Sequence, residues 1–157
     1  MELKAVLNQF RGKKIFITGH SGFKGSWLTF LFDQFGAITK GYALEPKTTP
    51  SLYKNLTFSN KHSSVYSDIN DYNSLLKEIK SFEPDFIFHL AAQPIVLASY
   101  EDPKTTFETN FNGTLNLLEV LRKSELPCTA IFITTDKVYE NKELNFPFSE
   151  EDKLGGK

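Results

Sequence analysis

Near its start the chain reads Lys14-Ile15-Phe16-Ile17-Thr18-Gly19-His20-Ser21-Gly22-Phe23-Lys24-Gly25, a short apolar run followed directly by a glycine-rich turn. The apolar run is typical of a strand that is buried on both faces. After the turn, apolar side chains recur at helical spacing, and a glycine then suits the helix end. These residues are Phe23, Trp27, Phe30, Leu31 and Phe35, with Gly36 as the terminator. The stretch therefore predicts a strand, a tight turn and a helix.

The same alternation of apolar runs and helical patterns continues along the chain. We expect further strands at residues 38–44, 65–66, 85–90 and 129–135, and helices at residues 72–82 and from Pro103 onward. The last helix carries an apolar stripe of Phe107, Phe111, Leu115, Leu118 and Leu121, and Pro127 lies in the loop behind it. Helical crossovers between buried strands predict a parallel sheet. The expected fold class is α/β, a Rossmann-like doubly wound sheet that stops before its last strands.

Composition and charge limit the class of protein. The chain has 157 residues, a formal net charge of −1, and hydrophobic and charged shares of 40% and 24%. This length suits one domain with its own core, and the small net charge argues against nucleic acid or a membrane surface as a partner. The sequence has neither a long apolar run nor the apolar core of a signal peptide, and lone Cys128 cannot form an internal disulfide. We therefore expect a cytoplasmic protein.

The turn after the first strand has the spacing G-x-x-G-x-x-G. Glycines at these positions permit a tight turn and let the backbone approach a pyrophosphate, which the following helix N-terminus stabilises. A purely structural strand-to-helix turn also uses glycine, so that reading stays open beside dinucleotide binding. The candidate cofactor contacts in the turn are Gly19, Ser21, Gly22, Phe23, Lys24 and Gly25.

Acidic residues after the second and third strands are candidates for the nucleoside end of such a cofactor. Glu45 lies 20 residues beyond Gly25, about where an acidic residue binds the ribose of NAD, although a solvated loop carboxylate fits as well. No arginine lies nearby to bind a 2′-phosphate, so NAD is favoured over NADP. Asp68 and Ile69 could bracket the adenine, while Asp71 also suits a helix cap.

Two histidines lie in the elements that carry these motifs, but we expect no metal site. His20 belongs to the glycine-rich turn and His89 to the fourth strand. Neither has partners at the spacing of metal ligands.

Longer motifs carry a family resemblance. With the glycine motif, Leu90-Ala91-Ala92-Gln93-Pro94 and Thr109-Asn110-Phe111-Asn112-Gly113-Thr114, the chain resembles the extended short-chain dehydrogenase/reductase family. Gly41-Tyr42-Ala43-Leu44-Glu45-Pro46 and Thr135-Asp136-Lys137-Val138-Tyr139-Glu140-Asn141 are similar to the CDP-glucose 4,6-dehydratases of that family. The resemblance covers about Gly12 to the last residue. It implies NAD as cofactor and a nucleotide sugar as substrate, with Leu90, Ala91, Ala92, Gln93 and Asn110 as further contacts at the cofactor.

The resemblance also implies a reaction. CDP-D-glucose would become CDP-4-keto-6-deoxy-D-glucose through internal hydride transfer and loss of water, as in nucleotide-sugar and lipopolysaccharide O-antigen biosynthesis. Thr135 would hydrogen-bond the sugar O4, and Asp136 would be the acid toward the C6 hydroxyl. Lys137 would remove the C5 proton or stabilise the enolate. Gln93 would reach the sugar or the nicotinamide ribose, and Asn110 would orient backbone. Without the resemblance, Thr-Asp-Lys is an ordinary polar turn.

The family pattern further implies that residues 1–157 form an incomplete NAD-binding domain without the C-terminal substrate domain. The family's catalytic Tyr-x-x-x-Lys pair is expected after the point where this chain ends, so we expect the chain to be inactive alone. Tyr100 and Lys104 have that spacing, but they precede the fifth strand and enclose Pro103. The full-length enzyme is expected to be a homo-oligomer. Two alternatives stay open: another sugar-nucleotide epimerase or dehydratase, or a non-catalytic NAD-binding module.

Overall fold

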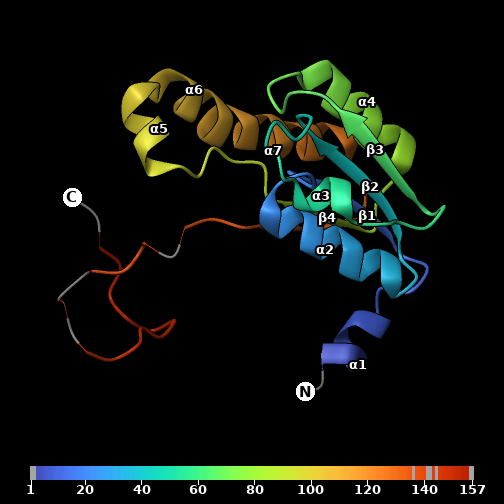
Figure 1. Cartoon of the computed structure of the whole chain (residues 1–157), viewed down its shortest axis with the longest axis horizontal. Helices are drawn as coiled ribbons and strands as arrows, with labels where there is room; N and C mark the ends of the chain where they lie inside the picture. Colours follow the sequence, from blue (N-terminus) through green and yellow to red (C-terminus); the bar gives the residue numbers. More distant parts are fainter. Residues whose placement is uncertain (1–2, 136, 141–142, 144, 156–157) are drawn as a thin grey trace.

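Five parallel strands form the centre of the molecule in the order β3-β2-β1-β4-β5 (Figure 1). The computed structural model describes residues 3–135, 137–140, 143 and 145–155. The strands are β1 (Lys14–Thr18), β2 (Ile38–Ala43), β3 (His62–Tyr66), β4 (Phe86–His89) and β5 (Thr129–Phe132). The helices are α1 (Leu3–Asn8), α2 (Phe23–Gln34), α3 (Leu52–Asn55), α4 (Tyr72–Phe82), α5 (Val96–Glu101), α6 (Pro103–Phe107) and α7 (Gly113–Ser124).

The strand order reverses at β1. The chain first builds outward from β1 through β2 to β3, then crosses to the other side of β1 to form β4 and β5. In register, Ile15 pairs with Thr39 of β2 on one side and with Phe86 of β4 on the other. A crevice opens at such a switch point, outside the carboxyl ends of the strands, and ligands of doubly wound sheets bind there.

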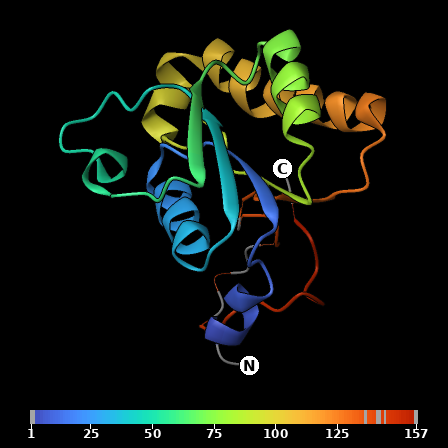
Figure 2. The ribbon, with the colours of Figure 1, turned by 90° about the vertical axis from the view of Figure 1, so that its right-hand side faces the viewer.

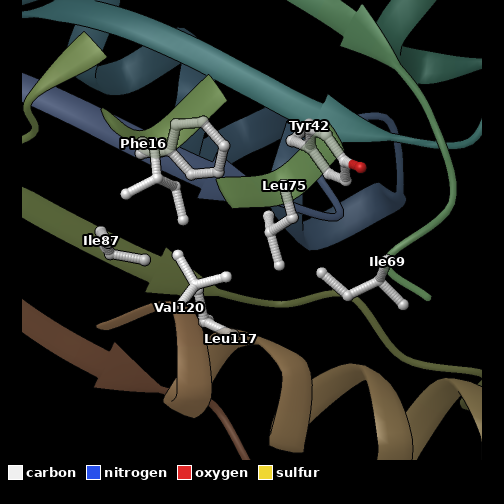
Figure 3. Packing of buried hydrophobic residues seen from close by; sticks show 8 residues of the cluster. Phe16, Tyr42, Ile69, Leu75, Ile87, Leu117 and Val120 are labelled. Atoms are coloured by element: carbon white, nitrogen blue, oxygen red, sulfur yellow. The ribbon is translucent and has the colours of Figure 1, made fainter. Parts of the chain in front are cut away.

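Helices cover both faces of the sheet, and each face has its own core. On one face, side chains of α4 and α7 meet those of the strands (Figure 3), with Leu75, Leu117 and Val120 wholly buried beside Phe16 and Ile87. The other core combines α1 and α2 with the opposite side of β1, through Leu7, Phe32, Ile15 and Ile17. These two layers confirm the expected doubly wound α/β class.

The segment after β5 leaves this layered body (Figures 1 and 2). Within it, Tyr139 forms an isolated antiparallel bridge with Leu154 and stacks on Phe148, with ring centroids 5.0 Å apart. Across the described residues, no helix combines the length and apolar composition needed to cross a bilayer.

The expected elements are present, with differences in extent. β5 ends at Phe132 rather than at residue 135, and β3 begins at His62, before the expected residues. The long helix from Pro103 is divided into α6 and α7 by a π-helical turn, Glu108–Asn112. A π-helical turn has i→i+5 hydrogen bonds in place of the α-helical i→i+4 bonds, and a search for the α-helical period alone does not identify it.

The apolar stripe of the long helix is not the face that is most deeply buried. Leu115 and Leu118 are 52% and 48% exposed and Leu121 is partly buried, whereas Leu117 and Val120 are fully buried. Gly113 lies on the same buried face, and a Cβ there would lie 2.5 Å from Cγ2 of Ile69 in the segment after β3. Periodicity identified an apolar face, but the close-packing face is marked by a glycine.

The apolar stripe of α2 is divided between two environments. Phe23 is 73% exposed and Trp27 is 45% exposed, whereas Leu31 and Phe35 pack against the core. The fully buried positions are mostly small or polar, and they are Gly25, Ser26, Thr29, Phe32 and Asp33. Small residues let α2 approach β1, and the Ser26 and Thr29 hydroxyls are satisfied by donating to carbonyls of the helix one turn earlier.

Adjacent leucines of α7 should differ sharply in their contribution to stability. We expect Leu117→Ala to lower the free energy of unfolding by about 2–5 kcal/mol, because it leaves a cavity, and Leu118→Ala to lower it by less than about 1 kcal/mol. Urea unfolding measures both, at protein concentrations where the midpoint does not depend on concentration. Equal losses would contradict this assignment of the buried face.

Candidate functional site

A cavity of about 520 Å³ opens at the carboxyl ends of β1, β2 and β4, at the switch point of the sheet. Its walls come from segments far apart in the sequence: the glycine-rich turn, the ends of β2 and β3, and the turn after β4. The lining residues are Gly19, Ser21, Gly22, Phe23, Lys24, Gly25, Tyr42, Ala43, Leu44, Ser67, Asp68, Ile69, Leu90, Ala91, Ala92, Pro94, Thr109, Ile133 and Thr134. The structure therefore brings eleven of the predicted cofactor contacts to one cavity.

The glycine-rich turn holds the end of β1 against the first turn of α2. Gly19 has a φ of +72°, which favours glycine. A Cβ at position 25 would overlap the Gly19 carbonyl oxygen, so only glycine allows α2 to start this close to the strand. Ser21 closes the turn on its outer side, because its hydroxyl donates to the Leu44 carbonyl oxygen at 2.8 Å.

Gly22 differs from its neighbours because the fold itself does not require glycine there. A Cβ at this position would meet only the Gly19 carbonyl oxygen, at an ordinary 3.4 Å. Gly22 is also the N-cap of α2, and it makes no side-chain cap hydrogen bond. The first-turn N–H groups of the helix thus face the cavity side without a side-chain cap, an arrangement that suits an anion such as a pyrophosphate.

The far wall is built by the segment after β3. The Tyr42 hydroxyl donates to the Asp68 carbonyl oxygen at 3.0 Å, which ties this segment to β2. The Asp68 carboxylate accepts from the Asn70 backbone N–H at 2.9 Å, and Ile69 is 5% exposed. Asp71 is the N-cap of α4 and accepts from the Ser74 N–H, so its capping alternative is confirmed.

The turn after β4 forms the opposite wall through Leu90, Ala91 and Ala92. Gln93 and Asn110 do not line the cavity and instead fasten this turn to the π-helical turn. The Gln93 backbone N–H donates to Asn110 Oδ1 at 2.7 Å, and Asn110 Nδ2 donates to the Gln93 carbonyl oxygen at 3.1 Å. This pairing fits the expectation that Asn110 orients backbone.

Glu45 lies outside the cavity lining, next to Leu44, which belongs to it. Its carboxylate is exposed and lies 3.9 Å from the ammonium group of Lys54 in α3. The ribose contact of Glu45 stays a prediction.

The polar segment after β5 begins at the cavity and then moves away from it. Ile133 and Thr134 line the cavity, while Thr135 is exposed and its hydroxyl accepts from the Lys137 N–H at 3.1 Å. Asp136 lies outside the described residues. The roles of Thr135, Asp136 and Lys137 therefore stay predictions.

Tyr100 and Lys104 are separated by the structure. Tyr100 lies in α5 and Lys104 in α6, with Asp102 breaking the helix between them as the N-cap of α6. A Tyr-x-x-x-Lys pair works from one helix face, where residues four apart are neighbours. This geometry supports treating the match as coincidental.

Both site histidines are buried and electrically neutral at ordinary pH. Burial together with the His62 imidazole lowers the pKa of His20 to about 4, and its ring packs over Gly41, where a Cβ would overlap it. Burial lowers the pKa of His89 to about 4. No group of three or more metal-ligating side chains occurs within the described part of the chain.

Eight lining residues were missed as site residues by the sequence reasoning, and these are Tyr42, Ala43, Leu44, Ser67, Pro94, Thr109, Ile133 and Thr134. Most share one signal, since they follow or end a parallel strand on its carboxyl side. Thr109 has no such signal, because only the π-helical turn brings it to the cavity.

Comparisons with known proteins agree with this geometry. A family model described as GDP-mannose 4,6 dehydratase matches residues 16–157. The CDP-glucose 4,6-dehydratase of Salmonella typhimurium is 42% identical over 149 residues, covering 95% of this chain and 42% of that protein. The CDP-paratose 2-epimerase of Salmonella typhi is 35% identical over 137 residues, covering 83% of this chain and 39% of that protein. The chain thus spans about two fifths of these relatives.

Solved structures share the fold. The UDP-glucose-4-epimerase of Stenotrophomonas maltophila, with bound NAD and formylated UDP-arabinopyranose, superposes with a TM-score of 0.79 at 21% identity, over 91% of this chain and 43% of that one. The UDP-glucose 4-epimerase of Thermotoga maritima, with UDP-glucose, gives a TM-score of 0.74 at 25% identity, over 90% of this chain and 44% of that one.

Proposed function

The chain belongs to the GDP-mannose 4,6-dehydratase family of nucleotide-sugar enzymes, and from that premise we propose that residues 1–157 are the NAD-binding part of a CDP-glucose 4,6-dehydratase. The observation that carries the proposal is the cavity at the switch point, bounded by the glycine-rich turn and the start of α2. The substrate domain is then supplied by sequence beyond these residues, as the two-fifths coverage of the relatives suggests.

The residues present fit NAD on the evidence of their own geometry. The fold has room for a side chain at position 22, yet the residue there is glycine and it lines the cavity at a helix N-terminus. Close approach of a ligand to the backbone best explains a glycine at this position. Ser21, Phe23 and Lys24 lie in the same wall, and Lys24 adds a positive charge. Asp68 and Ile69 suit the adenine, and Glu45 is proposed for the ribose hydroxyls.

When bound, NAD supplies the hydride chemistry, and the chain's own residues position groups and move protons. We assign the Thr135 hydroxyl to hydrogen-bond the sugar O4. Asp136 donates a proton to the departing C6 hydroxyl. Lys137 removes the C5 proton or stabilises the enolate, and Gln93 contacts the sugar or the nicotinamide ribose.

CDP-glucose is proposed over other nucleotide sugars because the Salmonella typhimurium relative combines high identity with nearly full coverage of this chain. Epimerisation is the second candidate, favoured by the match to CDP-paratose 2-epimerase.

An exposed apolar face on α5 to α7 supports homo-oligomer formation. It consists of Ile95, Val96, Leu97, Tyr100, Phe107, Phe111, Leu115 and Leu118, all at least 48% exposed. Monomeric soluble proteins rarely expose large apolar patches, and these residues belong to consecutive helices. A second copy of the chain that pairs through the same face would bury it symmetrically.

Replacement of Gly22 separates binding from folding. We expect Gly22→Ala to fold with a melting temperature close to that of the unsubstituted chain and to bind NAD at least about tenfold more weakly, because its methyl group occupies the space of the phosphates. Isothermal titration of the 157-residue chain measures the affinity. Gly25→Ala is the contrast, since it should lose stability first. An unsubstituted chain that does not bind NAD would contradict the proposed cofactor.

Joining residues 1–157 to the corresponding C-terminal part of the Salmonella typhimurium CDP-glucose 4,6-dehydratase tests the reaction. We expect the chimera to convert CDP-glucose with loss of one water, which mass spectrometry detects. We expect Asp136→Asn in the chimera to lower kcat by about 100-fold or more while NAD binding is retained. A chimera that folds and binds NAD without dehydrating would favour the non-catalytic alternative, and an isomerised product would favour an epimerase.

Charge placed on the exposed apolar face should separate the subunits. We expect the chain to sediment as a dimer or larger assembly and Leu118→Glu to sediment as a monomer with its far-UV circular dichroism unchanged. Lys77→Glu on α4 is a charge-changing control outside the face. An unsubstituted chain that sediments as a monomer would contradict the assignment of this face to subunit contacts.

A further inference from the structure

The buried His89 imidazole contacts the hydroxyl groups of two threonines, Thr18 and Thr114. The other hydrogen bonds of each threonine determine whether its hydroxyl donates to His89 or accepts from it. The His89 Nδ1 atom lies 2.7 Å from Thr18 Oγ1 at the end of β1, and its Nε2 lies 3.0 Å from Thr114 Oγ1 in α7. The imidazole is 4% exposed, so solvent does not complete these contacts. Its two ring nitrogens thus connect the strand before the glycine-rich turn with the helix after the π-helical turn.

The hydroxyl of Thr18 has only its own hydrogen to offer His89. Thr18 Oγ1 accepts from the backbone N–H groups of Leu90 and Ala91, both at 3.2 Å, and the Leu90 N–H also donates to the Thr18 carbonyl oxygen at 3.1 Å. With its oxygen so used, its hydrogen points to His89 Nδ1, which must be unprotonated to accept it. The side of the ring that faces β1 is therefore an acceptor.

The hydroxyl of Thr114 fixes the opposite polarity on the other side. It donates to the Asn110 carbonyl oxygen in the π-helical turn at 2.7 Å, which leaves its oxygen to accept from His89 Nε2–H. The Thr114 hydroxyl thus requires the neutral Nε2–H tautomer, and the acceptor role of Thr18 Oγ1 agrees with it. The lowering of the His89 pKa to about 4 by burial agrees with a ring that stays neutral.

These bonds close into a ring around one wall of the cavity. Ala91 is held to Thr18 by one hydrogen bond, and Gln93 is held to Asn110 by two. These two attachments act as clamps on the segment between them. We propose that His89, as the Nε2–H tautomer, is a positioning residue that couples these two clamps and so fixes the Leu90–Gln93 wall for the cofactor. The expected effect on cofactor binding rests on the proposed function, whereas the coupling of the two clamps through His89 does not.

The first test reads the tautomer in the unsubstituted chain. Long-range ¹H–¹⁵N spectra distinguish protonated from unprotonated ring nitrogens, and the absence of the signals in His89→Asn assigns them. We expect Nε2–H with bare Nδ1 at pH 7, persisting until titration near pH 4. An Nδ1–H tautomer, or an imidazolium at pH 7, would overturn the proposal.

The second test breaks the ring at its remote end. We expect Thr114→Val to speed hydrogen exchange of the Ala91 and Gln93 amides about tenfold, with β1 amides unchanged, and to weaken NAD binding about tenfold. Thr114→Ser keeps the hydroxyl and should restore both. A merely structural role would raise exchange across the sheet or lower the melting temperature instead.

The outcomes separate this proposal from the proposed function. Unchanged exchange at Ala91 and Gln93 in Thr114→Val would defeat the coupling even if the chain binds NAD. Failure of the unsubstituted chain to bind NAD would defeat the proposed cofactor, while the tautomer and the exchange rates would still decide whether His89 couples the clamps.

Discussion

The close approach of the first turn of α2 to the end of β1 is the contact on which the rest of the structure depends. Because Gly25 carries no Cβ, the helix can begin directly over the Gly19 carbonyl. This start directs α2 back along the sheet, where its small residues pack against β1. It also leaves the helix N-terminus beside the crevice where the strand order reverses. One steric requirement therefore sets both a layer of the fold and a wall of the cavity.

The opposite wall is held by polar groups instead of by close packing. Thr18, His89 and Thr114 are side chains of three different elements, and each hydroxyl or ring nitrogen has one direction left to it. Buried hydrogen bonds of fixed direction specify a geometry more narrowly than apolar contacts do. The cavity thus has one wall set by the absence of side chains and another set by their polarity.

The sequence was informative where a local pattern has one structural solution. β1 occupies Lys14–Thr18 as predicted, α4 occupies Tyr72–Phe82, and the glycine spacing located the cavity. It was less informative where an apolar stripe is only partly buried, as at Leu118, because periodicity does not say which side of the helix faces the sheet. It was silent on Thr109 and on the role of His89, since both depend on the π-helical turn and on partners distant in sequence.

The packing of His20 over Gly41 has an evolutionary consequence. The imidazole fills the volume that a side chain on β2 would otherwise occupy, so the two positions share one space. A larger residue at position 41 requires a smaller one at position 20, so replacing both residues together would be tolerated. Related sequences should therefore vary at these two positions together, although they are 21 residues apart, one in the glycine-rich turn and the other on β2.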